Sequence, residues 1–297
     1  MANTTKHTGN SRFFYKTALT ALTACIAGGL LLGNAGCAHN QKGADETAAA
    51  GADVKQANEK DPTALIRESE AGNLEAVQAL IAAGADVNAA DNVGQMALMA
   101  ATPKGHLEVL KALIAAGADV NAAKGKTGLT ALHLAVTERN RTDAVKLLIE
   151  AGADVNAAEM KGRTPLMLAL FMALLGEDSG AANLSMLMEA KADVNAADRD
   201  GITPLMLAST ATSYAENPKF VKKLIEAGAD VNAADNIGKT ALMRAADKGR
   251  TEIVKALIDA KADVKTKDNE GQTALDFARA DEIKQILLEA TENGAKK

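Results

Sequence analysis

Apolar and polar residues alternate along most of this chain in a pattern that predicts pairs of short helices. In one longer helix the apolar face consists of Val109, Leu110, Leu113 and Ile114. A shorter apolar segment precedes each such helix, starts in most cases at Thr-Ala-Leu or Thr-Pro-Leu, and ends after about two turns at a glycine or asparagine such as Gly105 or Asn140. Threonine is a favourable N-cap, and glycine and asparagine adopt the left-handed conformation that ends helices. The predicted unit is therefore helix, turn, helix, loop.

The unit is repeated at a nearly constant period. The phrase GADVNAA begins at Gly84, Gly117, Gly152 and Gly228, KADVNAA begins at Lys191, and KADVK begins at Lys261. The aspartates of these phrases lie 33, 35, 39, 37 and 33 residues apart. A period of this length marks a solenoid of stacked units. Seven units are predicted, which begin near Asp61, Asp91, Lys124, Glu159, Asp198, Asp235 and Asp268.

These motifs resemble the ankyrin repeat, over residues 61 to about 291. The matching sequences are GKTAL at 238–242, GHLEV at 105–109 and the GADVNAA phrases. The histidine that usually follows the leucine is present at His133, and Met99, Met167, Met206 and Met243 replace it elsewhere, where we expect core packing. The resemblance implies an all-α ankyrin-repeat solenoid of about seven helix-turn-helix units with β-hairpin finger loops, in a domain spanning 61–297.

Residues 1–36 have the layout of a secretory signal. Three basic residues precede an uncharged run at 17–36, and no acidic residue occurs before Asp45. The run ends in NAGC at 34–37, which resembles the lipobox of bacterial lipoproteins and implies acylation of Cys37, although Asn34 departs from the usual leucine. LTAC ending at Cys25 matches that motif better, but cleavage there would leave an apolar segment on the mature chain. A cleaved soluble signal and an uncleaved anchor are further alternatives.

Residues 37–60 are polar and alanine-rich, and we expect a flexible tether there. Because Ala38 follows Cys37, the lipoprotein resemblance implies an outer-membrane lipoprotein facing the periplasm. The alternative is a soluble periplasmic or secreted protein. Apart from this N-terminal lipid we expect no contact with the membrane.

Composition narrows the chemistry that the repeats can perform. Both cysteines lie in or at the end of the leader, which excludes disulfides, thiolate nucleophiles and cysteine-ligated zinc in the repeats. The 33 basic and 38 acidic residues give a net charge of −5, which disfavours nucleic acid as a partner. His106 and His133 lack neighbours at metal-ligand spacing, and the repeated Asp and Asn residues are expected to satisfy loop backbone groups. We therefore expect no catalytic site, metal or cofactor.

The finger loops vary within the fixed frame of the repeats, as a recognition surface does. The alternative is that these residues are simply exposed to solvent and vary without a role in binding. The candidate protein-binding residues in the fingers are Asn92, Val93, Gln95, Lys126, Thr127, Leu129, Met160, Lys161, Arg163, Arg199, Asp200, Ile202, Asn236, Ile237 and Lys239.

The 39- and 37-residue units are lengthened between their two helices. These extensions carry Phe171, Met172, Tyr214 and Phe220, which we interpret as an aromatic anchor patch for a partner. The alternative is that they pack only on each other and cap the lengthened helices.

The sequence thus predicts an exported, lipid-anchored and monomeric repeat protein that mediates protein–protein interaction in the bacterial cell envelope and has no catalytic activity. The alternative function is that of an immunity-type inhibitor that neutralises a periplasmic enzyme.

Overall fold

The computed structural model describes residue 61 and residues 63–210 and 217–294. The predicted signal sequence, Cys37, the tether and Tyr214 lie outside the described residues. Within them, no helix is both long enough and apolar enough to cross a membrane.

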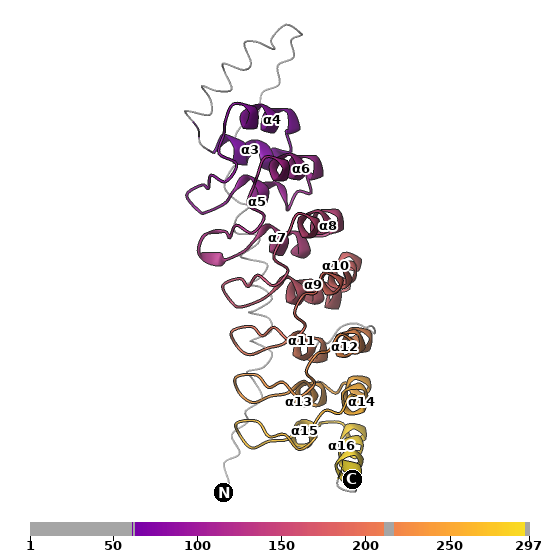
Figure 1. Cartoon of the computed structure of the whole chain (residues 1–297). Coiled ribbons are helices and arrows are strands. Elements are labelled where there is room, and N and C mark those ends of the chain that lie inside the picture. Colours follow the sequence, from indigo (N-terminus) through magenta and orange to yellow (C-terminus); the bar gives the residue numbers. More distant parts are fainter. Residues whose placement is uncertain (1–60, 62, 211–216, 295–297) are drawn as a thin grey trace, which may run out of the picture. The chain divides into compact units, whose positions relative to one another are not determined.

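The described helices occur in seven successive pairs, as the sequence predicts (Figure 1). The pairs are α3 (Ala64–Ala71) with α4 (Leu74–Ala82), α5 (Ala97–Ala101) with α6 (Leu107–Ala115), α7 (Ala131–Thr137) with α8 (Thr142–Glu150), α9 (Pro165–Leu174) with α10 (Asp178–Glu189), α11 (Pro204–Thr210) with α12 (Asn217–Glu226), α13 (Ala241–Asp247) with α14 (Thr251–Asp259), and α15 (Ala274–Phe277) with α16 (Asp281–Gly294). A 3₁₀ turn, η1 (Gly125–Thr127), lies in the third finger.

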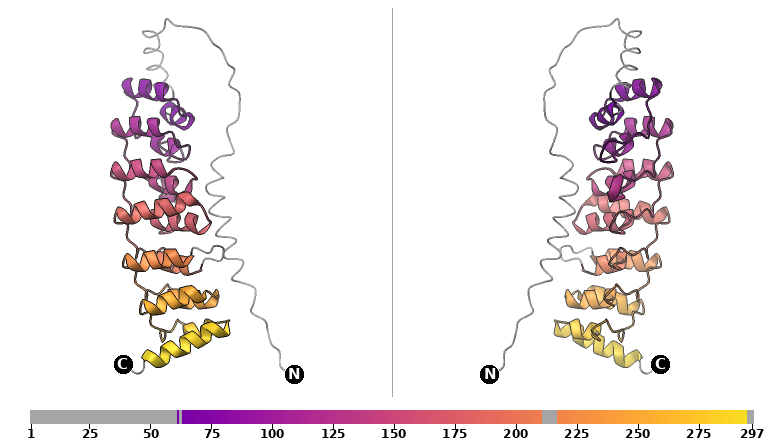
Figure 2. Two further views of the ribbon diagram at one scale, coloured as in Figure 1. Left: turned by 90° about the vertical axis from the view of Figure 1, so that its right-hand side faces the viewer. Right: turned by 90° about the vertical axis from the view of Figure 1, so that its left-hand side faces the viewer.

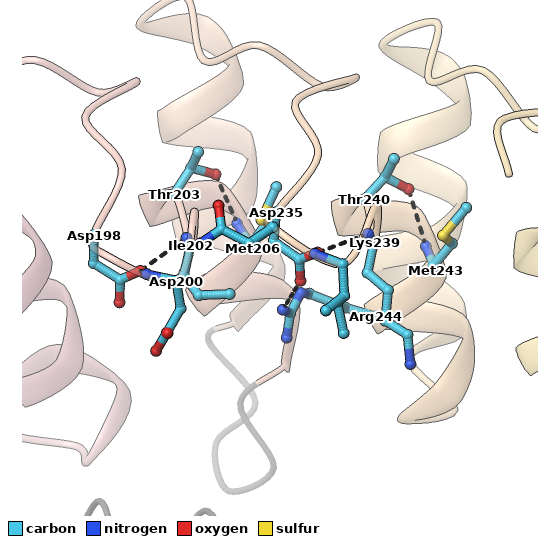
Figure 3. A network of polar contacts seen from close by, with 12 residues as sticks. Asp198, Asp200, Ile202, Thr203, Met206, Asp235, Lys239, Thr240, Met243 and Arg244 are labelled. Carbon is cyan, nitrogen blue, oxygen red and sulfur yellow. Dashed lines mark hydrogen bonds and ion pairs between the residues drawn. The ribbon is translucent and has the colours of Figure 1, made fainter. Parts of the chain in front are cut away.

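Threonines start most of the first helices. The Thr240 hydroxyl accepts a hydrogen bond from the Met243 N–H at 3.4 Å, and Thr203 caps α11 in the same way (Figure 3). In the second unit Met96 stands at the cap position and provides no side-chain hydrogen bond. The first N–H groups of a helix have no carbonyl partner within the helix, and without a capping side chain one of them loses its hydrogen-bond acceptor. The helix that follows, α5, has only five residues.

Left-handed residues end the first helices, as predicted. Gly72, Gly105, Asn140 and Gly249 have φ values of 79°, 71°, 57° and 67°. After this turn the second helix runs antiparallel to the first and presents its apolar face to it. The chain turn is thus encoded within each unit.

One continuous apolar cluster joins all seven units. The methionines that replace the family's histidine, Met99, Met167, Met206 and Met243, are each no more than 2% exposed, which confirms their predicted place in the core. First helices contact first helices of the neighbouring units, and second helices contact second helices, so the described units form two parallel rows of helices (Figure 2). Each unit therefore buries its apolar surface mainly against its neighbours.

The fingers are hairpins that are too short to contain regular strands. Isolated antiparallel bridges close three of them, between Ala90 and Met96, Lys124 and Leu129, and Ala234 and Thr240. In Figure 1 the fingers project from the helices on the side of the first-helix row.

Candidate protein-binding surface

A carboxylate at the base of each regular finger fixes the shape of its tip. Asp235 Oδ1 accepts hydrogen bonds from the N–H groups of Ile237 at 2.9 Å and Lys239 at 2.8 Å. Figure 3 shows the bond to Lys239. Asp91, Glu159, Asp198 and Asp268 bind the residues two and four positions on in the same way. Because the base residue holds the backbone, the tip side chains are free to vary without loss of the loop conformation.

Backbone hydrogen bonds join each tip to the next. From the third finger to the seventh, the N–H of one tip donates to a carbonyl of the preceding tip. The pairs are Met160 to Thr127 at 2.8 Å, Arg199 to Lys161 at 2.9 Å, Asn236 to Asp200 at 3.1 Å and Asn269 to Ile237 at 3.1 Å. We call these joined tips the tip row. The tip row is therefore a ladder of backbone hydrogen bonds in which each finger is one rung, and each finger displays one or two side chains at its tip.

Glycine is required where neighbouring tips meet. Gly238 has a φ of 80°, and a Cβ placed on it would lie 2.9 Å from the backbone nitrogen of Asn269 in the next finger. A Cβ placed on Gly201 would lie 2.8 Å from the backbone nitrogen of Asn236. A side chain at either position would therefore both strain the backbone and separate the tips.

The predicted finger residues separate into an exposed tip set and a half-buried base set. Asn92, Val93, Lys126, Met160, Lys161, Arg199, Asp200, Asn236 and Ile237 are exposed, whereas Gln95, Thr127, Leu129, Arg163, Ile202 and Lys239 are half-buried. Val93, Met160 and Ile237 are 59%, 46% and 55% exposed, so three of the five large apolar side chains that are most exposed in the described residues lie on finger tips. The tip set is therefore the accessible part of the candidate surface.

Several base residues serve the scaffold itself. The Lys239 Nζ lies 4.4 Å from the centre of the Phe277 ring, a cation–π contact with the next unit. Gln95 Oε1 accepts a hydrogen bond from Lys124 Nζ at 2.8 Å, and the Thr127 hydroxyl donates to the Lys124 carbonyl at 2.6 Å. Part of the variation at these positions is thus explained by contacts within and between units.

Three of the four residues predicted as an aromatic anchor patch on the two extensions lie in the described part of the chain, and none of these three is exposed. Phe220 is only 3% exposed, because it takes the inward position of α12 that Val109 takes in α6 and Ile253 in α14. Phe171 and Met172 are half-buried. An exposed anchor at Phe220 is therefore wrong.

A buried ion pair lies beneath the sixth finger and was not expected from the sequence. The Arg244 guanidinium of α13 donates to the Asp235 carboxylate, whose side chain is 2% exposed (Figure 3). Asp235 therefore serves the finger through one oxygen and the first helix through the other. The available signal was an arginine at a position that is apolar in four other units, namely Ala100, Leu134, Leu168 and Leu207. Arg67 of the first unit takes the same position and pairs with Asp61.

The two described histidines have structural partners. His133 is fully buried, its Nδ1 lies 2.9 Å from the Thr130 hydroxyl, and its Nε2 lies 3.2 Å from the Arg163 carbonyl. Burial lowers the pKa of this imidazole because it disfavours the charged form. His106 Nε2 lies 3.2 Å from the Glu70 carbonyl of the preceding unit. In the described part of the chain, no three His, Cys, Asp or Glu residues are grouped as metal ligands.

The repeated Asp and Asn residues of the GADVN phrases bind backbone, as predicted, and the asparagines do so across units. Asp230 Oδ1 accepts the N–H of Asn232 at 2.9 Å within its own loop. Asn195 Oδ1 accepts the N–H of Asp230 at 2.7 Å, and its amide donates to the Gly228 carbonyl at 3.1 Å, both in the next unit. The conserved spacing within the phrase thus connects successive loops as well as closing each one.

Comparison with known families agrees with this architecture. The model for ankyrin repeats in three copies matches residues 33–124, 173–268 and 209–297, and the single ankyrin-repeat model matches 127–159. These matches span more than half of the chain. The chain belongs to the ankyrin-repeat family. Ankyrin-repeat domains are generally scaffolds for protein–protein interaction and usually not catalytic. No curated protein sequence matches this ankyrin-repeat protein.

Solved ankyrin-repeat structures resemble the described units. The ankyrin repeat domain of Bcl-3, a member of the IkappaB protein family, is 29% identical, with a TM-score of 0.66, and the match covers 76% of this chain and 98% of that domain. The ankyrin repeat domain of human ASB11 is also 29% identical, with a TM-score of 0.58, and the match covers 76% of this chain and 96% of that domain. This ankyrin-repeat protein therefore shares the stacked-unit architecture over nearly the full length of both domains.

Proposed function

We propose that this ankyrin-repeat protein is exported to the bacterial cell envelope, anchored there by a lipid on Cys37, and acts as a non-catalytic scaffold that binds a protein partner through the tip row. The observation that carries the binding function is the exposure of Met160 and Ile237 in the tip row and of Val93 on the neighbouring second finger. Carboxylates fix the backbone of all three fingers, and inter-finger hydrogen bonds join the fingers of Met160 and Ile237 to their neighbours. Rigid, apolar and exposed positions lose little conformational entropy when a partner covers them.

The export and anchoring part rests on the basic, then uncharged, segment before Cys37. One acyl chain binds membranes marginally, whereas several chains hold a protein firmly. The Cys37→Ser variant should accumulate as unprocessed precursor or move from the membrane fraction to the soluble fraction. Normal processing with unchanged fractionation would rule out the lipid anchor and leave the binding function untouched.

The binding part is tested by affinity capture from envelope fractions with the full chain. The triple variant Val93→Ser, Met160→Ser and Ile237→Ser should lose the captured partner and keep its thermal stability, since these side chains are exposed. Leu288→Ser is the matched control, because Leu288 is 49% exposed on α16 and outside the tip row. Equal capture by the triple variant would exclude these three exposed apolar side chains as the binding surface. Recovery of a single enzyme in equimolar amount would favour the immunity-type inhibitor over a general scaffold.

A further inference from the structure

The middle of the tip row carries an excess of positive charge on an acidic protein. In ladder order from the third finger to the fifth, the residues are Lys126, Thr127, Met160, Lys161, Arg199 and Asp200. Three of these are cations and one is an anion, although the whole chain has a net charge of −5. We call Lys126, Lys161 and Arg199 the basic tip strip.

The cations of the basic tip strip differ from those on the second helices. Lys111 and Lys146 form ion pairs with Glu108 and Glu150 one turn away on their own helices. Lys126, Lys161 and Arg199 form no ion pair with another described residue. Lys161 and Arg199 are also adjacent, because the Arg199 N–H donates to the Lys161 carbonyl at 2.9 Å. Like charges on neighbouring rungs repel each other, and an anionic partner relieves this repulsion.

The ladder also limits how a partner can bind. The N–H groups of Met160 and Arg199 are already bound to the preceding tips, and the N–H of Lys161 is bound to Glu159. An added strand would need such groups free. Recognition at the strip must therefore use side chains, with Met160 as an apolar contact between the cations.

Resting on the proposed binding function, we infer that the basic tip strip binds an acidic protein segment in which carboxylates flank an aliphatic side chain. The carboxylates pair with Lys126, Lys161 and Arg199, and the aliphatic side chain covers Met160. Nucleic acid fits less well, because the described tips carry no aromatic side chain for base stacking and the net negative charge repels a polyphosphate.

The test measures binding of labelled peptides to the full chain at low and at physiological salt. The probes are a 12-residue peptide of glutamates around a central leucine pair, the same peptide with glutamine for glutamate, and a single-stranded oligonucleotide of equal charge. The protein variants are the triple Lys126→Glu, Lys161→Glu and Arg199→Glu, and a matched triple Lys111→Glu, Lys146→Glu and Lys222→Glu on the second helices. Both triples change the net charge equally.

We expect the acidic peptide to bind the full chain and the tip triple to weaken this binding about tenfold or more, whereas the matched triple changes it less than about twofold. The affinity should fall as salt rises. Equal weakening by both triples would reduce the effect to net charge and overturn the inference. Equal binding of the glutamine peptide, or tighter binding of the oligonucleotide, would overturn it as well. A captured natural partner that is basic, or that still binds the tip triple, would contradict the inference and preserve the proposed scaffold function.

Discussion

At the residue scale, the end of each of the first six second helices depends on one left-handed position. Gly84, Gly117, Gly152 and Gly228 take this position with φ values of 86° to 91°, and Lys191 and Lys261 take it with φ values of 66° and 69°. A Cβ placed on any of these four glycines would have no other atom within 4 Å. The two lysines therefore carry a backbone cost without a steric clash.

We expect Lys191→Gly and Lys261→Gly each to raise the free energy of unfolding by about 0.5–1 kcal/mol, because relief of the left-handed strain exceeds the entropy that glycine adds to the unfolded chain. Urea unfolding followed by circular dichroism measures the change. Gly228→Lys is the reverse substitution and should lower stability by a similar amount. A loss of stability in either lysine variant would show that the side chain contributes more than the backbone costs.

Burial of His133 gives stability a defined pH dependence. The pKa of its imidazole is lowered in the native state, whereas in the unfolded chain it has the ordinary value of about 6.5. As pH falls below that value, the unfolded chain takes up a proton that the native state excludes, so stability falls until the lowered native pKa is reached. The slope from this residue is at most about 1.4 kcal/mol per pH unit.

The His133→Met variant, which uses the residue found at the same position in other units, should lose stability less steeply between pH 7 and pH 5. Chemical unfolding at several pH values compares the two slopes. Loss of the contacts with Thr130 and Arg163 lowers the whole curve and leaves its slope unaffected. Parallel curves for the two proteins would mean that the pKa of His133 is the same in the native and the unfolded state.

At the element scale, α10 places a polar side chain where its neighbours place apolar ones. Asn183 is fully buried, and neither its amide nitrogen nor its carbonyl oxygen has a hydrogen-bond partner in the described residues. The same helix position is Val109 in α6, Ala144 in α8 and Ile253 in α14. A buried polar group without a partner costs about 1–3 kcal/mol.

Asn183→Val should therefore raise the free energy of unfolding by about 1–2 kcal/mol. Thermal and urea unfolding both report this change. The reverse substitution in a neighbouring unit, Val109→Asn, should lower stability by at least the same amount. If Asn183→Val destabilises the protein, the asparagine has a partner that the hydrogen-bond pattern of α10 does not show.

At the scale of the whole molecule, hydrogen bonds between the loops of successive units couple the stability of one unit to that of the next. Asn195 joins the fourth unit to the fifth by two hydrogen bonds, and Asn88, Asn121, Asn156 and Asn232 make the corresponding contact at the other junctions. In the last phrase Lys265 replaces the asparagine, and the seventh unit, which follows this phrase, contains no further ADVN sequence in the described chain. The substitution thus falls where the contact has no partner.

We expect Asn195→Ala to cost about 1–2 kcal/mol, since it removes two hydrogen bonds and leaves the Asp230 N–H and Gly228 carbonyl to water. Hydrogen exchange should show faster opening on both sides of this junction, because solenoid units are coupled through their interfaces. Lys265→Ala is the matched control and should change stability by less than about 0.5 kcal/mol. If the two variants lose similar amounts of stability, the cost arises within the loop and not from the hydrogen bonds between units.

The sequence alone determined the features that act over short distances. Threonine caps, left-handed glycines and the apolar face of each helix operate within about four residues, so the helix pairs, their ends and the buried methionines could be predicted from the repeats. The family resemblance then supplied the stacking of the units and the finger loops. The exposure of the finger tips followed from the same repeat plan.

Only the tertiary structure decided which side chains meet across units. The Asn195 bond joins residues 35 apart, and the joining of Arg199 to Lys161 depends on the distance at which two units stack. The inward direction of Phe220 follows from the register of α12, which begins directly after the lengthened segment. These distances are set by packing between units, because no local preference within one unit defines where the next unit lies.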